Sequence, residues 1–144
     1  MIFLSVADVL KIHRLTIDEQ GGGEGIRDEN LLQSALAAAQ NRFFYENADL
    51  AACAATYAFH LSKAHAFVDG NKRIAAVAAE VFLLINRAIL NAGDDALEKL
   101  YLNIADGTLT RDEVEEFFRG ASLYFVAYFD NQGRVYWQRV ILKS

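Results

Sequence analysis

Alanine recurs in dense runs along the first part of the chain, and no proline occurs anywhere in its 144 residues. The runs fall at 35–39, 51–58 and 75–79. Alanine has the highest helix propensity, its small side chain lets two helices approach closely, and proline would interrupt them. The sequence therefore predicts an all-α domain built from closely packed helices.

Apolar spacing and capping residues predict where six helices begin. The expected N-terminal residues are Ser5, Asp28, Asp49, Asn71, Asp94 or Asp95, and Thr110. The aromatic and polar segment 40–47 interrupts the helical periodicity, which predicts a loop or a short hairpin there. The glycine cluster at 21–25 matches no phosphate-binding fingerprint, and it predicts a helix C-cap followed by a linker.

The C-terminal part changes character after a helical domain at 1–120. Two runs of β-branched and aromatic residues flank a turn that contains Gly133. This pattern predicts a β-hairpin extension at 121–144. Both faces of the hairpin are largely apolar, so we expect it to be covered. Its own domain, a second copy in a homodimer and another partner are equally compatible with the composition.

Charge and hydropathy exclude two classes of protein. The formal net charge is −5, whereas broad binding of nucleic acid needs a basic face. No signal peptide pattern and no apolar run of roughly 18 to 20 residues occur, which predicts a cytoplasmic protein without a membrane partner. Cys53 stands among alanines and is expected to fill a core space. His13 and His60 are expected to be structural.

The stretch HAFVDGNKR, residues 65–73, collects groups that bind anions. Asn71 is expected near a helix N-terminus, where unpaired N–H groups and a partial positive charge attract phosphate. Gly70 lets the backbone approach a ligand closely. Lys72 and Arg73 add a point charge and a planar fork suited to phosphate oxygens.

The same stretch holds a carboxylate and a base. Asp69 can bind Mg²⁺ that bridges to phosphates on the loop, and His65 can take a proton from a hydroxyl at neutral pH. Phe67 is expected to point into the core. Taken one by one, these residues are equally ordinary caps, solvated cations and a structural histidine. Their chemistry alone leaves both interpretations open.

HAFVDGNKR resembles the signature of the Fic/Doc superfamily. In that signature, His-x-Phe-x-Asp/Glu is followed by a small residue, then Asn, then Gly or Lys, and finally Arg. Lys72 stands where Fic enzymes carry glycine, and it resembles the death-on-curing (Doc) branch. GIRDENLLQSALAA, RFFYE and FLLINRAIL are also similar to that branch. The resemblance covers residues 3–119 and implies a Fic/Doc-type helical bundle. Ala66 stands where many relatives have proline, and Arg87 stands where many have glycine. Neither departure removes a catalytic group.

The resemblance implies a role for each motif residue. These roles are His65 as catalytic base, Phe67 as core anchor, Asp69 as Mg²⁺ ligand, Gly70, Asn71 and Lys72 as anion-binding loop, and Arg73 as ligand of the nucleotide phosphates. The segment 42–47 would be the flap that aligns the target polypeptide.

The Doc branch implies a toxin that transfers the γ-phosphate of Mg-ATP to a hydroxyl of a protein such as a translation elongation factor. Fic enzymes transfer AMP instead, and they tend to carry a second arginine where this chain has Ala76. Ala76 and Lys72 therefore favour phosphate transfer. No inhibitory Ser/Thr-x-x-x-Glu-Gly/Asn string occurs, so an antitoxin is expected in trans. Transfer of AMP or another nucleotide, and a catalytically idle interaction module, remain alternatives.

Overall fold

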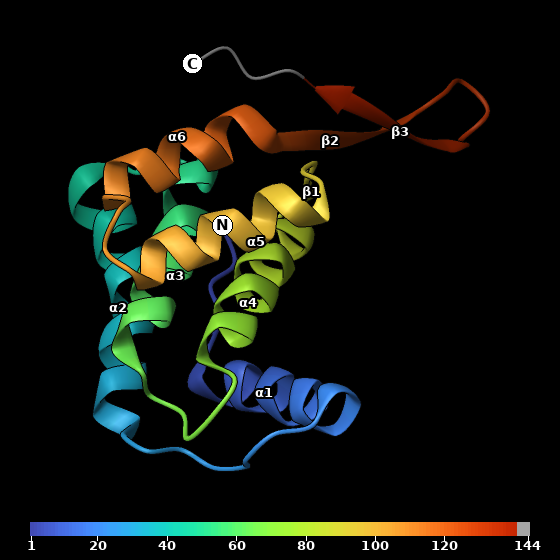
Figure 1. Ribbon diagram of the computed structural model, residues 1–144. Helices are drawn as coiled ribbons and strands as arrows, with labels where there is room; N and C mark the ends of the chain where they lie inside the picture. The colour runs from blue at the N-terminus through green and yellow to red at the C-terminus, as the bar shows by residue number, and fades with distance from the viewer. Residues whose placement is uncertain (141–144) are drawn as a thin grey trace.

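The computed structural model describes residues 1–140, which form six helices and a small sheet (Figure 1). The elements are α1 (Val6–Gln20), α2 (Glu29–Glu46), α3 (Leu50–Ala64), α4 (Asn71–Ile85), β1 (Ala88–Leu90), α5 (Asp94–Ala105), α6 (Arg111–Ala121), β2 (Ser122–Phe129) and β3 (Val135–Val140). The expected helical bundle with a C-terminal hairpin is confirmed. No helix among the described residues is both long and apolar enough to cross a bilayer.

Four of the predicted N-caps are formed by the expected side chains. Ser5, Asp28, Asp49 and Thr110 each accept a hydrogen bond from the backbone N–H three residues further on. At Thr110 the return bond from the backbone to Glu113 completes the predicted capping box. Local chemistry therefore determines where these helices start.

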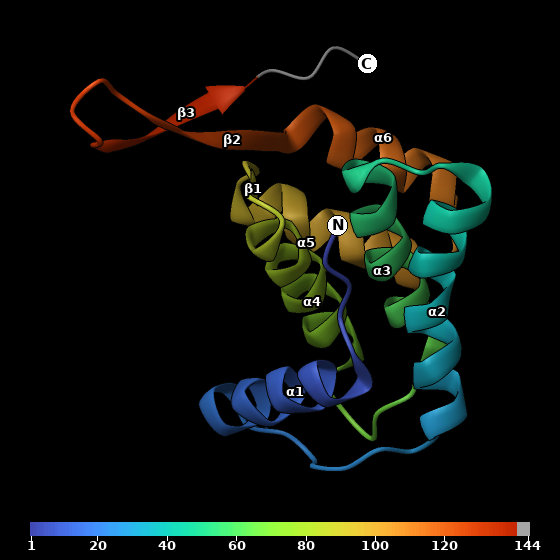
Figure 2. The same ribbon diagram turned by 180° about the vertical axis from the view of Figure 1, so that it is seen from behind.

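Helix α3 is the centre of the bundle. Ten of its fifteen residues are buried, and it packs against α2, α4, α5 and α6. Figures 1 and 2 show α3 between α2 and α4 from both sides. The fully buried Tyr57 ring packs edge-on against Phe82 of α4, and its hydroxyl accepts a hydrogen bond from the Leu4 N–H at 3.1 Å. The alanine run at 51–58 is thus the surface on which the neighbouring helices meet.

Cys53 lies in this core, as predicted. Its side chain is fully buried, and its thiol is 3.7 Å from the Ala39 carbonyl oxygen. Burial raises the pKa of the Cys53 thiol to about 11. The thiolate is therefore scarce at neutral pH, which agrees with a packing role.

The prediction of a loop or hairpin at 40–47 was wrong. Helix α2 continues through Glu46 and ends at Asn47 in the left-handed conformation. Phe43 packs edge-on against Phe3, whereas Phe44 and Tyr45 are 69% and 85% exposed. Helical periodicity is recognised on the assumption that large apolar side chains are buried. Because two of the three consecutive aromatic residues here are exposed, the apolar pattern does not follow the helical period.

The hairpin belongs to a three-stranded antiparallel sheet in the order β1-β2-β3. Strand β1 was not predicted; it pairs through Ala88 opposite Tyr124 and continues from Arg87, which has a positive φ of 67°. Three residues are too few to display an alternating pattern. The predicted turn lies between Phe129 and Val135, which pair with each other.

Beyond β1 the hairpin projects away from the helices (Figures 1 and 2). Tyr124 at its base packs against the core, but Phe129 and Trp137 are 72% and 61% exposed. The expected cover by its own domain therefore exists only at the base. Residues 141–144 of the predicted extension lie outside the described residues.

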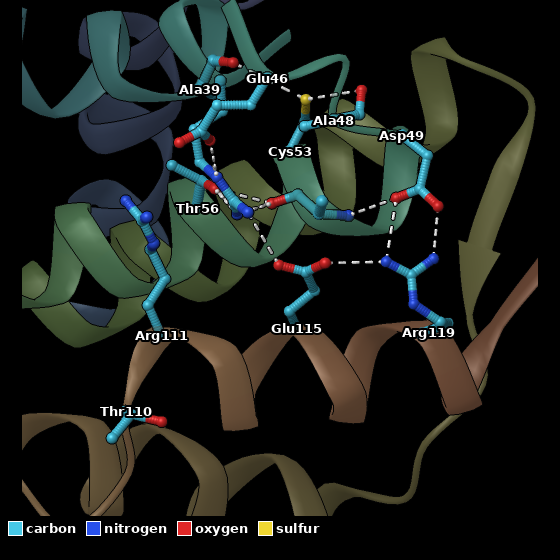
Figure 3. Close-up of polar contacts among 12 residues, drawn as sticks. Ala39, Glu46, Ala48, Asp49, Cys53, Thr56, Thr110, Arg111, Glu115 and Arg119 are labelled. Carbon is cyan, nitrogen blue, oxygen red and sulfur yellow. Dashed lines mark hydrogen bonds and ion pairs between the residues drawn. The ribbon is translucent and has the colours of Figure 1, made fainter. Parts of the chain in front are cut away.

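A chain of ion pairs joins α2, α3 and α6 where α3 begins (Figure 3). Glu115 accepts from Arg42 at 3.0 Å and from Arg119 at 2.8 Å. Arg119 also pairs with Asp49, the N-cap of α3. Arg42 and Glu115 expose only 15% and 20% of their side chains, so water screens this pair weakly. The network fixes the N-terminal end of α3.

Removing Glu115 should destabilise the fold. Glu115→Ala leaves two neighbouring guanidinium groups without their shared carboxylate, so we expect the free energy of unfolding to fall by about 2 kcal/mol. Urea denaturation followed by circular dichroism measures the change. The exposed Glu116, one residue further on, provides the control: Glu116→Ala should change stability by less than about 0.5 kcal/mol. Equal losses in both variants would contradict a structural role for the network.

Candidate active site

The motif begins where α3 ends. His65 is the C-cap of α3 and adopts the left-handed conformation, with φ 49° and ψ 42°. Histidine is among the non-glycine residues that populate this region most readily, and the turn redirects the chain. The imidazole is exposed to solvent. Residues held in such conformations are concentrated at functional sites.

The carboxamide of Asn71 holds the loop in shape. Its oxygen accepts a hydrogen bond from the Phe67 N–H, and its nitrogen donates to the Phe67 carbonyl, both at 3.0 Å. The side chain of Asn71 is therefore occupied by the loop backbone. Any contribution of Asn71 to anion binding must come from its own backbone N–H.

His13 and Phe67 anchor the loop to α1. Their rings stack at a centroid distance of 4.0 Å, and the two side chains are buried. His13 Nε2 lies 2.9 Å from the backbone oxygen of Asp69, which is hydrogen-bond distance. The structural role predicted for His13 and the core position predicted for Phe67 are confirmed. His60, outside the motif, accepts from Arg111 at 3.3 Å when its Nε2 is unprotonated.

The chain segment beside the motif is 25–28, not 42–47. The N–H groups of Arg27 and Asp28 donate to the Ala66 carbonyl at 2.7 and 3.1 Å, and Val68 N–H donates to Gly25. Segment 42–47 instead contacts the first half of α3, where Arg42 donates to the Ala52 carbonyl and to the Thr56 hydroxyl. The motif begins at the C-terminal end of α3, and a helix of fifteen residues is about 22 Å long. Segment 42–47 lies toward the opposite end, so it is not placed to act as the flap that the resemblance implies.

Asp69 is exposed, and its carboxylate is oriented by backbone groups. Gly70 N–H donates to Oδ1 at 2.8 Å, and Gly23 N–H donates to Oδ2 at 3.2 Å. These two bonds lower the pKa of the Asp69 carboxyl, and the charge of Arg73 lowers it further. A Cβ added at Gly22 would lie 2.7 Å from Oδ2. The glycine cluster expected to be a linker therefore also closes over Asp69.

The start of α4 presents free backbone donors and cations. Gly70 is its N-cap, with φ 78°, and the first intrahelical bond is donated by Ile74 N–H. The N–H groups of residues 71–73 precede that bond and are open to an anion. Lys72 is exposed, while the Arg73 guanidinium donates to the Gln20 side chain and the Gly21 carbonyl, both at 3.2 Å.

One cleft of about 310 Å³ contains every site residue predicted from the sequence. Its walls are formed by Ser62, His65, Val68, Asp69, Gly70, Asn71, Lys72, Arg73 and Ala105. Sequence reasoning missed Ser62, Val68 and Ala105. Ser62 precedes His65 by three residues on α3, and its buried hydroxyl has no hydrogen-bond partner among residues 1–140. Ala105 comes from α5, and no motif marks it.

The donor set fits a magnesium ion that arrives with phosphates. No group of three His, Cys, Asp or Glu residues suitable for a metal occurs in the described chain. Asp69 alone offers carboxylate oxygens, each of which accepts one hydrogen bond and keeps a further lone pair. Magnesium characteristically uses one or two carboxylates, water and substrate phosphates. The cleft provides the carboxylate and the anion site side by side.

Comparison with known proteins agrees with this geometry. The sequence model of the Fic/DOC family matches residues 3–83. The chain is also 32% identical over 87 residues to "Protein kinase doc" of Escherichia phage P1, which covers 60% of this chain and 69% of that protein. The chain therefore belongs to the Fic/DOC family, and within it to the Doc branch. The residues of the cleft lie within the matched range, except Ala105.

Asn71→Ala should loosen the loop while leaving the helices intact. The Phe67 amide would lose its side-chain acceptor, so we expect it to exchange with solvent faster. The free energy of unfolding should fall by about 1–2 kcal/mol because a part-buried pair of hydrogen bonds is lost. Hydrogen exchange followed by NMR tests this, with the exposed Asn30→Ala as control. Unchanged protection of the Phe67 amide would show that Asn71 does not hold the loop.

Proposed function

We propose that this protein is a Doc-type phosphotransferase toxin that transfers the γ-phosphate of Mg-ATP to a hydroxyl of a protein. The observation that supports it best is the single cleft that brings together His65, Asp69 and the N-terminus of α4. Membership of the Doc branch supports the same reaction, because the matched phage protein is named a protein kinase.

In this reaction the acceptor hydroxyl oxygen attacks the γ-phosphorus. His65 takes the hydroxyl proton, the bond from the γ-phosphorus to its bridging oxygen breaks, and ADP leaves. The N–H groups at the start of α4, Lys72 and Arg73 offset the charge on the phosphate oxygens. Asp69 would hold Mg²⁺, which neutralises part of the phosphate charge when it is bound.

Two residues favour phosphate transfer over AMP transfer. Lys72 adds a cation where Fic enzymes carry glycine, and Ala76 stands where they carry a second arginine. Without that arginine, the side of α4 away from His65 has less positive charge for a terminal phosphate. The alternative, transfer of AMP or another nucleotide, would use the same His65 base.

The partners we propose follow from the branch and from the sequence. A translation elongation factor is the proposed acceptor class. An antitoxin supplied in trans would restrain the enzyme, since the chain carries no inhibitory string of its own. Residues 25–28, which pair with the motif loop, are the segment best placed to guide an acceptor polypeptide.

Labelled ATP distinguishes the two reactions. Incubated with a cell extract and Mg²⁺, the protein should transfer label from the γ-position of ATP to a protein band and none from the α-position. Label from the α-position alone would contradict phosphate transfer. Failure of the folded protein to bind any nucleotide with Mg²⁺ would favour an idle interaction module.

Replacing the base should abolish transfer without unfolding the protein. Asparagine tolerates the left-handed conformation of residue 65 but cannot act as a general base, so His65→Asn should reduce the rate by about 100-fold or more. The control is His60→Ala, because His60 lies outside the cleft and should leave the transfer rate nearly unchanged. A His65→Asn protein that reacts at the wild-type rate would remove the assigned base.

A further inference from the structure

Strand register divides the small sheet into two faces. Successive residues of a strand point to opposite faces, and residues directly opposite each other in an antiparallel pair point to the same face. Ala88, Tyr124 and Val140 stand side by side across the three strands. Ala88 is buried and Tyr124 packs against the helical core, so their side of the sheet is its inner face.

The outer face lies on the other side of the sheet and is almost wholly apolar. It consists of Ile89, Leu123, Phe125, Ala127, Phe129, Val135, Trp137 and Arg139. The projecting part of the inner face, in contrast, carries the hydroxyl groups of Tyr128 and Tyr136 and the carboxamide of Gln138. An antiparallel sheet that packs on one side normally presents polar residues on the other. This sheet does the reverse, so its outer face has the composition of a contact surface.

The size of the outer face matches one half of a stable dimer. Phe129, Trp137 and Val135 are 72%, 61% and 54% exposed, and Ile89 is 37% exposed. Since a large aromatic side chain has about 150–250 Å² of surface, the face as a whole offers roughly 500 Å² of apolar area. An interface of standard size buries about 800 Å² per partner, of which about 65% is apolar in homodimers. The two apolar areas agree.

Charge favours a second copy of this chain as the partner. A two-fold contact places a patch against itself, so a patch with many charges of one sign would repel its copy. The outer face carries one charged side chain, Arg139. Residues 1–121 contain 18 acidic and 11 basic side chains, so two helical parts repel each other. The hairpin projects away from the helices and offers a contact at a distance from that charge (Figures 1 and 2).

The relief of the outer face is also self-complementary. Ala127, the smallest side chain on it, pairs directly with Trp137, the largest. The face therefore has a hollow beside a projection, and packed sheets interdigitate by placing large side chains over small ones. A second copy supplies one indole ring for each hollow.

We propose that the outer face of the β1–β2–β3 sheet is a homodimer interface, in which two hairpins pack face to face about a two-fold axis. The contact buries Phe129, Val135 and Trp137 of both copies and leaves the tyrosines of the inner face in water. Strand β1 follows the end of α4, whereas the cleft lies at its start. The dimer therefore does not use the residues of the cleft.

The mass of the protein in solution tests this interface. Sedimentation equilibrium of the wild-type chain at micromolar concentration should give twice the chain mass of 16.0 kDa. Trp137→Glu brings two carboxylates into the contact, so we expect the dissociation constant to rise at least about 100-fold. The control is Gln138→Glu, which adds the same charge to the next residue of β3 on the inner face, and it should keep the wild-type mass.

The fluorescence of Trp137 provides a second measurement, because it is the only tryptophan of the chain. On dilution of the wild-type protein, the emission should shift to longer wavelength as the dimer separates and the indole becomes exposed. Phe129→Glu keeps this reporter and covers the case in which Trp137→Glu does not fold. Its emission should stay at long wavelength at every concentration, with a circular dichroism spectrum like that of the wild type.

Three results would overturn the proposal. A folded wild-type chain that remains at 16.0 kDa would exclude the homodimer and leave the outer face to a different protein. A dimer that persists in folded Trp137→Glu or Phe129→Glu, or that Gln138→Glu dissociates equally, would place the contact elsewhere. A mass that rises beyond two chains with concentration would contradict a closed two-fold contact.

Discussion

The burial of α3 on nearly every side is the constraint on which the site depends. Its small side chains let α2, α4, α5 and α6 approach, so the helix cannot shift without disturbing all four. Asp49 at its beginning is held by the ion pairs of Arg119, and His65 is its C-cap. The distance between the imidazole and the start of α4 is therefore set by core packing rather than by the loop alone.

Within the loop, structural and chemical tasks fall to different groups. The Asn71 carboxamide and the Phe67 ring are both engaged with other parts of the chain. The imidazole of His65 and the ammonium group of Lys72 remain exposed, and the first N–H groups of α4 remain open. A site whose donors are fixed before the ligand arrives needs little reorganisation during reaction, which is the usual source of electrostatic stabilisation.

The sequence predicts well what local chemistry decides. Caps such as Thr110 and the helix start at Asn71 depend on neighbouring residues, and they were found. The residues of the candidate site could be predicted together because they are consecutive in the sequence. Segment 25–28 and Ala105 meet the loop or its cleft from distant parts of the chain, and no periodicity shows which segments meet in space. Strand β1 depends on pairing with β2, about thirty residues later, so its own residues carry little signal.

The orientation of the nucleotide in the cleft is the most direct test of the account. A crystal structure of the protein with Mg²⁺ and a non-hydrolysable ATP analogue measures it. The account predicts the γ-phosphate nearest His65 and Mg²⁺ held by Asp69. An α-phosphate nearest His65 would contradict it and would indicate AMP transfer.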